Sequence, residues 1–246
     1  MLPPTPRDEA NWLLTQLSDI AYERVMVIAE SVDLPFKAVL SEPNEPIEYA
    51  HFPETACLSI ITMMGGGHAV EVGTVGPDGL TGLSFIHDIA SEPTRCIAQI
   101  GGAAKRIRRA AFVAELMDNR ELAGLVHRYA QAWTEQIGRS GTCNAVHSIQ
   151  ERCARWLLMT HDRLGTDTLP LTQEFLATML GVRRPSVTLA AGSLQTAGLI
   201  HYTRGRIKVL DRAGLEAASC ECYRAIQNSY DRLLSRRING VARQAT

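Results

Sequence analysis

The sequence predicts an α+β chain with an N-terminal antiparallel β-barrel or jelly roll, a long helix and a C-terminal winged helix-turn-helix domain. Three observations lead to this fold class. Short β-prone pieces alternate with turn signals between Pro35 and about Phe112, an apolar stripe at helical spacing follows, and residues 172–210 contain two short helices and a hairpin. At 246 residues the chain is long enough for one or two domains with a buried core.

Two kinds of pattern fill the first half of the chain. Residues 11–34 carry apolar side chains at helical spacing, which predicts one or two short helices. The strands are then predicted from "ACLSIITMM", "HAVEVGTVG", "RCIAQIG" and "KRIRRAAF", with "GGGH", "GPDG", "SEP" and "GG" as turns. Short strands at such regular spacing favour an antiparallel barrel or sandwich. In "MMGGGHAVEV" the glycines predict a hairpin turn with positive φ.

After Phe112 the turn signals end, and apolar residues at three- and four-residue steps predict a helix of about seven turns. The stripe consists of Leu122, Leu125, Val126, Tyr129, Trp133, Ile137 and Ser140. Such a helix can lie on its own barrel, or it can bury half of its stripe against a second copy of the chain. Its length favours the second interpretation. We therefore expect a dimer interface at Leu122, Leu125, Val126, Tyr129, Trp133 and Ile137.

A new helix is predicted from Ser148, which forms a capping box with Glu151 three residues later. Its buried face is Ile149, Cys153, Trp156, Leu157 and Leu164. We expect the domain boundary and hinge just before it, near residues 144–147. The predicted divisions are a β-barrel domain with N-terminal helices (1–114), the dimerisation helix and hinge (115–146), the winged helix-turn-helix (147–222) and a helical tail (223–246).

The stretch "TQEFLATMLGVRRPSV" predicts two helices joined by a tight turn. Thr172 is a good N-cap for the first helix, Gly181 suits a left-handed turn at its end, and Pro185 fits the first turn of the second helix. The inward face of the second helix is expected at Val187, Leu189, Ala190, Leu194 and Leu199. In "GLIHYTRGRIKVLD" a hairpin turning at Arg204-Gly205 predicts the wing.

The polar residues of this region predict a DNA-binding surface. The expected base contacts come from the second helix, and phosphate contacts from the wing and the start of the first helix. The candidates are Thr172, Gln173, Arg183, Arg184, Ser186, Thr188, Arg204, Arg206 and Lys208. Residues 146–246 hold 14 Lys and Arg against 8 Asp and Glu, whereas the first 145 residues hold 11 against 18. A basic half beside an acidic half favours a polyanion-binding domain attached to another domain.

From Ser148 to about Leu210 the chain resembles the DNA-binding domain of the Crp/Fnr transcriptional regulators, in "ERCARWLL", "PLTQEFLATMLGVRRPSVTLAAGSLQTAGLI" and "RGRIKVLD". The preceding "GPDGLTGLSFIHDIASEPTRCIAQIGG" and the long helix resemble the cyclic-nucleotide-binding-like effector domain and dimer helix of that family. The resemblance implies a homodimeric transcription regulator on a palindromic site, with a barrel that senses a signal. We expect double-stranded DNA, a second copy, RNA polymerase and an unidentified small-molecule effector as partners, and no membrane.

The resemblance also implies where an effector would bind. In members that bind cyclic nucleotides, a Gly-Glu-Leu segment holds the ribose, and a later Arg-Ser or Arg-Thr pair holds the phosphate. The corresponding candidates here are Gly82, Leu83, Arg95 and Cys96. Because Gly82 takes the glutamate position, we expect no ordinary cyclic nucleotide binding, and no other cofactor is evident. Pro185 and Leu189 stand where many relatives carry Glu and Arg, so the target sequence of those relatives does not transfer.

Other functional classes have weaker support. The dipeptides His87-Asp88 and His161-Asp162 occur in different predicted domains, so they favour no catalytic site. The six cysteines are expected to be free buried thiols, and since no second pair lies near Cys220 and Cys222 in sequence, no metal site is predicted.

The chain shows no long apolar run and no signal-peptide pattern at its N-terminus, so a cytoplasmic protein is expected. The main alternative function is a small-molecule sensor or protein-interaction module whose winged helix no longer binds DNA tightly.

Overall fold

The computed structural model describes residues 11–65 and 69–234. Its helices are η1 (Leu14–Gln16), α1 (Asp19–Ile28), η3 (Leu83–His87), α2 (Arg109–Asp118), α3 (Arg120–Val146), α4 (Ile149–Leu164), α5 (Gln173–Leu180), α6 (Arg184–Thr196), α7 (Arg212–Ala217) and α8 (Cys222–Leu234). Its strands are β1 (Glu30–Leu34), β2 (Val39–Ser41), β3 (Tyr49–Pro53), β4 (Cys57–Met63), β5 (Ala69–Val75), β6 (Arg95–Ile100), β7 (Gly102–Arg108), β8 (Thr168–Leu169), β9 (Ile200–Thr203) and β10 (Arg206–Val209). Among the described helices, none is both long and apolar enough to cross a membrane.

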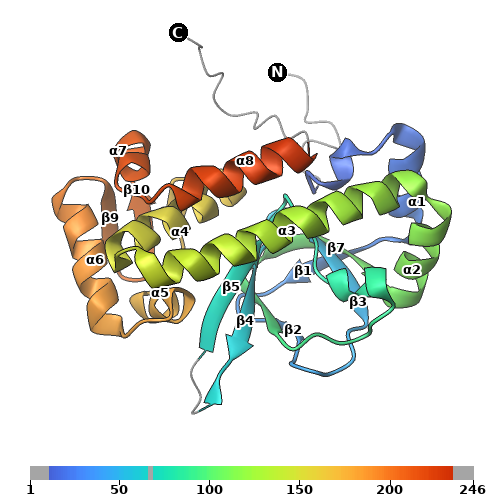
Figure 1. The fold of residues 1–246 in the computed structure, drawn as a ribbon, viewed down its shortest axis with the longest axis horizontal. Helices are drawn as coiled ribbons and strands as arrows, with labels where there is room; N and C mark the ends of the chain where they lie inside the picture. The colour runs from blue at the N-terminus through green and yellow to red at the C-terminus, as the bar shows by residue number, and fades with distance from the viewer. Residues whose placement is uncertain (1–10, 66–68, 235–246) are drawn as a thin grey trace, which may run out of the picture.

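The N-terminal domain consists of two antiparallel sheets with a jelly-roll-like arrangement (Figure 1). The strand orders are β1-β7-β3 and β2-β6-β4-β5, so the described strands do not close into one barrel. Between the sheets lies a small core that includes Leu34, Leu58, Cys96 and Ala104. The predicted antiparallel jelly roll is therefore confirmed as two facing sheets.

Strands β1, β2 and β3 are additions to the predicted pattern. The helical spacing predicted for residues 11–34 holds only to Ile28, and Glu30–Leu34 forms strand β1 instead. The reason is tertiary, because β1 pairs along its whole length with Gly102–Arg106 of β7. The predicted hairpin of β4 and β5 is confirmed by their antiparallel pairing, while residues 66–68 of its glycine turn lie outside the described residues.

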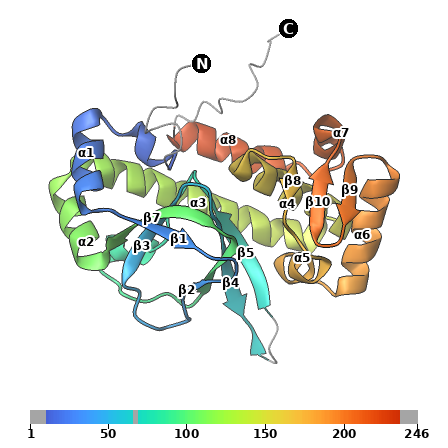
Figure 2. The ribbon, with the colours of Figure 1, turned by 180° about the vertical axis from the view of Figure 1, so that it is seen from behind.

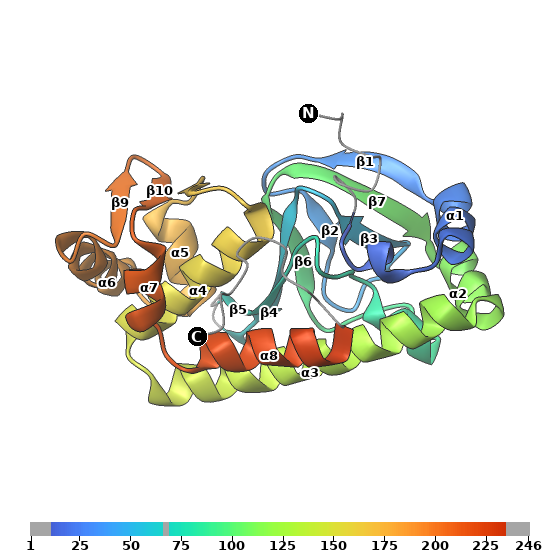
Figure 3. The same cartoon turned by 90° about the horizontal axis from the view of Figure 1, so that it is seen from above.

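The long helix α3 has 27 residues and runs from beside the jelly roll to the C-terminal domain (Figure 1). On one side it faces β5, where a Cβ added to Gly73 would lie 2.6 Å from the Trp133 ring. On another side it carries α8, which lies antiparallel along it (Figure 3). The Tyr129 and Tyr230 rings meet edge to face there, with 6.3 Å between their centroids. Much of the apolar stripe of α3 is therefore buried within the chain itself.

The predicted capping box begins the C-terminal domain. The Glu151 amide donates to the Ser148 hydroxyl, and the Ser148 amide donates to the Glu151 carboxylate. Cys153, Trp156 and Leu157 on the predicted face of α4 are buried, whereas Ile149 and Leu164 are half-buried. Helices α5 and α6 and the sheet β8-β10-β9 pack around α4 (Figure 2).

Candidate DNA-binding surface

Helices α5 and α6 are joined by the predicted tight turn. The Phe175 amide donates to the Thr172 hydroxyl over 3.1 Å, which confirms the N-cap of α5. α5 ends at Gly181, whose φ of 63° is the left-handed conformation that glycine adopts without strain. α6 then begins at Arg184, with Pro185 in its first turn. These local signals set the crossing of the two helices.

Packing decides which face of α6 is exposed. Its buried side chains are Val187, Ala190, Ala191 and Leu194. The prediction that Leu189 belongs to this inward face is wrong, since Leu189 is 74% exposed. Two helical positions after Val187 correspond to a rotation of about 200°, so Leu189 points away from the core and lies beside the polar face.

Two arginines begin the exposed face of α6. Arg183 is the N-cap residue without a side-chain capping bond, Arg184 follows it, and both are exposed. Within the described residues, no ion pair engages either guanidinium. Their charges are therefore available to a polyanion.

The other predicted contacts of the two helices are partly used within the protein. Ser186 is half-buried in the first turn of α6. The Thr188 hydroxyl lies 3.0 Å from the Gln173 side-chain oxygen and 3.1 Å from the Arg184 carbonyl oxygen. Thr188 and Gln173 thus tie α6 to the start of α5 and hold Arg184 in place.

The wing, formed by β9 and β10, lies beside α6 (Figure 2) and carries the cations Arg204, Arg206 and Lys208. Strands β9 and β10 pair antiparallel around Arg204 and Gly205, whose φ values of 29° and 82° make the hairpin turn. Ile207 and Val209 face inward, so the alternation of a strand leaves Arg206 and Lys208 exposed. A Cβ added to Gly205 would lie 3.5 Å from the Thr172 methyl group. The wing tip therefore adjoins the start of α5, as a continuous surface requires.

The four effector-pocket candidates do not converge. Gly82 and Leu83 line a hollow of about 140 Å³ that Trp133 and Ile137 of α3 close. Arg95 lines a separate groove of about 430 Å³ between the jelly roll and α5, and it forms two hydrogen bonds of 2.7 Å with Glu42. Cys96 is buried between the two sheets.

Gly82 cannot be exchanged for a larger residue without strain. Its φ is 78°, and an added Cβ would lie 2.9 Å from the Phe85 ring. A side chain at this position would therefore strain the backbone and crowd Phe85.

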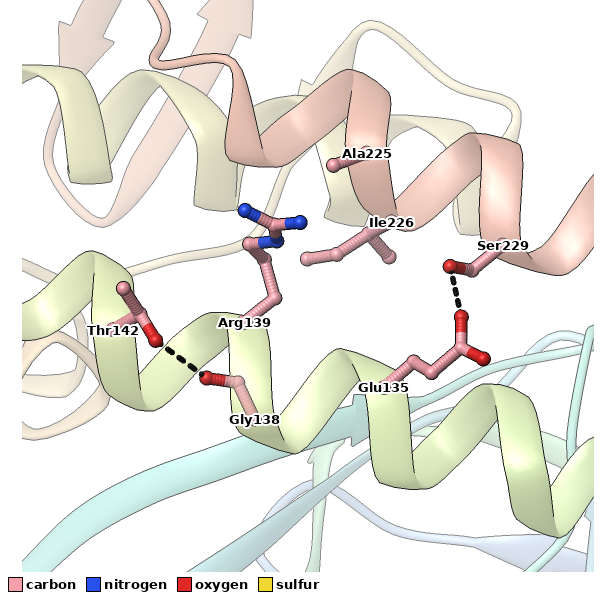
Figure 4. Close-up of a pocket in the computed structure, with 7 residues that line it drawn as sticks. All are labelled: Glu135, Gly138, Arg139, Thr142, Ala225, Ile226 and Ser229. Carbon is pink, nitrogen blue, oxygen red and sulfur yellow. Dashed lines mark hydrogen bonds between the residues drawn. The ribbon is translucent and has the colours of Figure 1, made fainter.

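The predicted dimer residues lie largely inside the chain. Leu122, Leu125, Val126 and Tyr129 are at most 1% exposed, while Trp133 and Ile137 are half-buried. Sequence reasoning did not anticipate that α8 covers α3. Figure 4 shows the groove of about 590 Å³ between these two helices, where Arg139 points toward α8 and Ser229 donates to Glu135.

Buried polar contacts fix the jelly roll to the C-terminal domain. Asp78 accepts a 3.0 Å hydrogen bond from Arg163 of α4, and both side chains are 4% exposed. Glu71 of β5 accepts a 2.7 Å hydrogen bond from the indole N–H of Trp156. Burial raises the pKa of Glu71 to about 7, against hydrogen bonds from Ser59 and Trp156 that lower it. Gly181 also lies on β5, since its added Cβ would be 3.1 Å from Val70.

The two His-Asp dipeptides are engaged in structural contacts. Asp88 pairs with Arg109 over 2.6 Å, and Asp162 pairs with Arg212 over 2.6 Å. His161 lies in the last turn of α4, 2.9 Å from Asp167. The described residues around them suggest no catalytic arrangement.

Comparison with known proteins agrees with this architecture. Residues 151–218 match the family model of the Crp-like helix-turn-helix domain. The chain carries a Crp-like helix-turn-helix domain. This Crp-like domain spans α4, α5, α6, the wing and α7, and so includes every candidate DNA contact. A search of curated protein sequences finds no match.

Solved structures of Crp/Fnr regulators share the fold of most of this chain. FixK2 from Bradyrhizobium japonicum superposes with a TM-score of 0.68 at 17% identity, covering 78% of this chain and 98% of its own. The CRP-family regulator TTHB099 from Thermus thermophilus superposes with a TM-score of 0.65 at 18% identity, covering 76% of this chain and 96% of its own. CLP, a c-di-GMP-responsive global regulator from Xanthomonas campestris, superposes with a TM-score of 0.62 at 14% identity, covering 78% of this chain and 99% of its own.

Proposed function

We propose that this Crp/Fnr-type protein is not an enzyme but a sequence-specific DNA-binding transcription regulator. We propose further that it works in the cytoplasm. One observation carries the proposal. Arg183 and Arg184 stand exposed at the start of α6 without ion-pair partners among the described residues, and the wing cations lie on the same surface. Between Leu171 and Leu210, Glu174 is the one acidic residue. A groove in DNA is the partner that this arrangement fits best.

The proposed contacts follow from side-chain chemistry. Arg184 pairs bidentately with a guanine edge in the major groove, and the exposed Leu189 packs on a thymine methyl group. Phosphates are held by the first amides of α5 at Thr172 and Gln173, and by Arg183. Arg204, Arg206 and Lys208 of the wing hold flanking phosphates, which adds affinity without base preference.

We infer a homodimer on a palindromic site, with the two α6 helices in successive major grooves about 34 Å apart. Because the chain itself covers most of the apolar stripe of α3, the proposed contact between copies is the outward face of this helix, which presents Gly138 and Arg139 beside the α8 groove. RNA polymerase is the proposed protein partner of the DNA-bound dimer. DNA selected from a random pool is expected to contain two inverted half-sites, and a single half-site would contradict the dimer.

The signal is proposed to be a small molecule other than a cyclic nucleotide. The hollow at Gly82 holds about 140 Å³, below the roughly 300 Å³ at which ligand pockets begin, and Glu92 adds a negative charge to it. The groove of about 430 Å³ that Lys37 and Arg95 line is large enough, and it touches α5 directly. Binding there would act on the Crp-like domain through Phe175, whose ring lies 6.2 Å from that of Phe36.

Salt dependence tests the proposed function. If Arg183 and the three wing cations each engage a phosphate, a dimer makes about eight such contacts, and log K against log salt should have a slope of about −7. Fluorescence anisotropy with the selected DNA measures this slope. Arg120→Ala, an exposed cation at the far end of α3, is the control that leaves the slope unchanged. A flat response would instead support a sensor or interaction module whose winged helix no longer binds DNA tightly.

Arg184→Ala should weaken binding to the selected site by about 1–3 kcal/mol and relax the base preference at one position of each half-site. The cause is the loss of a bidentate pair with guanine. Lys208→Ala is the contrasting variant, because the loss of a phosphate contact should weaken all sequences alike and reduce the salt slope. Competition binding with single-base variants of the site measures both. Equal weakening on every sequence would assign Arg184 to a phosphate.

A further inference from the structure

Three cysteines and a histidine from distant parts of the chain meet at one end of α3. Cys143 and His147 lie one helical turn apart at the end of α3, and Cys220 and Cys222 flank the start of α8. The ligand atoms of these four side chains all lie within 4.8 Å of one another. Because α3 and α8 run antiparallel, the end of α3 lies beside the start of α8 (Figure 3). Cys143 and His147 therefore supply the second pair of ligands that the sequence near Cys220 and Cys222 lacks.

The spacing of these atoms fits a single tetrahedral ion. With Zn–S bonds of about 2.3 Å and Zn–N bonds of about 2.0–2.1 Å, two thiolates lie about 3.8 Å apart, and a thiolate lies about 3.6 Å from a ligating nitrogen. The Cys143 and Cys220 sulfurs are 3.4 Å apart, and the Cys222 sulfur is 3.7 Å from Nδ1 of His147. A four-iron cluster, with an iron at each thiolate, needs its ligands farther apart.

The surroundings of the cluster also suit a metal ion. Nε2 of His147 lies 3.1 Å from the Glu221 carboxylate, which orients the ring and leaves Nδ1 facing the thiols. Three thiolates around a divalent ion leave a net charge of about −1. The positive charge of the buried Arg155 favours the thiolate form of Cys143 and so offsets this negative charge. All three thiols are buried, so the ion would have no open position for substrate.

We propose that Cys143, His147, Cys220 and Cys222 form a structural zinc site that binds the start of α8 to the end of α3. The site adjoins the junction at residues 147–148, where α3 passes into the Crp-like domain. Zinc therefore holds α8 along α3, where Ser229 and Arg232 contact Glu135. Binding energy at such a site is folding energy, so the ion stabilises the folded chain directly.

Metal content tests the site. The full chain, purified in reducing buffer and supplied with Zn²⁺, should retain one zinc per chain by mass spectrometric metal analysis after desalting. Replacement by Co²⁺ should give thiolate charge-transfer bands and the intense visible bands of a tetrahedral ion. Cys220→Ser should lower the affinity for zinc at least tenfold, whereas the control Cys153→Ser, which removes a buried thiol outside the cluster, should keep the ion.

A second measurement covers the case in which Cys220→Ser fails to fold. Addition of a zinc chelator to the wild-type chain should lower its melting temperature and make three further thiols reactive, and Zn²⁺ should reverse both changes. Three results would overturn the proposal: folded wild-type chain that retains no zinc, a Cys143–Cys220 disulfide in its place, or an iron–sulfur spectrum.

Discussion

Asp78→Asn is expected to lower the free energy of unfolding by about 3–5 kcal/mol. The substitution keeps the shape of the side chain but removes the charge that faces Arg163, and both residues are 4% exposed. Arg163 also donates to Thr74 over 2.5 Å and to Gln136 over 3.1 Å, so it remains buried and charged without its paired carboxylate. Since domains are stable by about 5–15 kcal/mol, this is a large share of the total.

Urea unfolding at neutral pH measures this loss, and Asp88→Asn is the matched control. Asp88 also pairs with an arginine, over 2.6 Å, but its side chain is 81% exposed. Water screens such a pair, so its loss should cost at most about 1 kcal/mol. If the two variants lose equal stability, the Asp78–Arg163 pair does not anchor the domains.

The position of this pair explains why it matters for function. Arg163 belongs to α4 of the Crp-like domain, whereas Asp78 and Thr74 belong to the jelly roll and Gln136 to α3. One guanidinium therefore joins the three parts that a signal would have to move relative to one another. The proposed regulator would transmit a change in the jelly roll to α6 through such contacts.

The sequence predicted best those features that depend on neighbouring residues. Thr172, Gly181 and Pro185 define α5, its turn and α6 by local hydrogen bonding and backbone preference, and the structure confirms each of them. The Ser148–Glu151 capping box is local in the same sense. The candidate surface was accessible to sequence reasoning because these short-range signals set it.

Features that depend on distant partners were missed. The segment of strand β1 has apolar residues at helical spacing, but it forms a strand because it pairs with β7. Nothing in the spacing of Tyr230 or Ser229 indicates that α8 covers α3. The thiol cluster joins residues 77 positions apart, so the pair at Cys220 and Cys222 had no visible complement in sequence. A histidine four residues after Cys143 was the one signal that could have suggested it.

Glu71→Gln is expected to stabilise the protein at pH 8 by up to about 3 kcal/mol and to leave its stability at pH 4.5 nearly unchanged. Burial raises the pKa of Glu71 from 4.5 to about 7 in the folded state. Because the folded pKa lies above the unfolded one, the stability contribution of this carboxyl is complete below about pH 4.5 and is lost as pH rises through about 7. At about 1.36 kcal/mol for each tenfold change in proton affinity, the loss is about 3 kcal/mol.

Glutamine removes this loss because it is neutral at every pH and can keep both contacts of the glutamate. Its carbonyl oxygen can accept from the Trp156 indole, and its amide can donate to the Ser59 hydroxyl. Urea unfolding of both proteins from pH 4.5 to 8 gives the difference in stability, in which the contributions of other titrating groups cancel. Glu48→Gln, which removes an exposed carboxylate, is the control: its stability should differ from that of the wild type by the same small amount at every pH in this range. A difference for Glu71→Gln that does not change with pH would mean that Glu71 is ionised in the folded protein, held by Trp156 and the nearby Arg155.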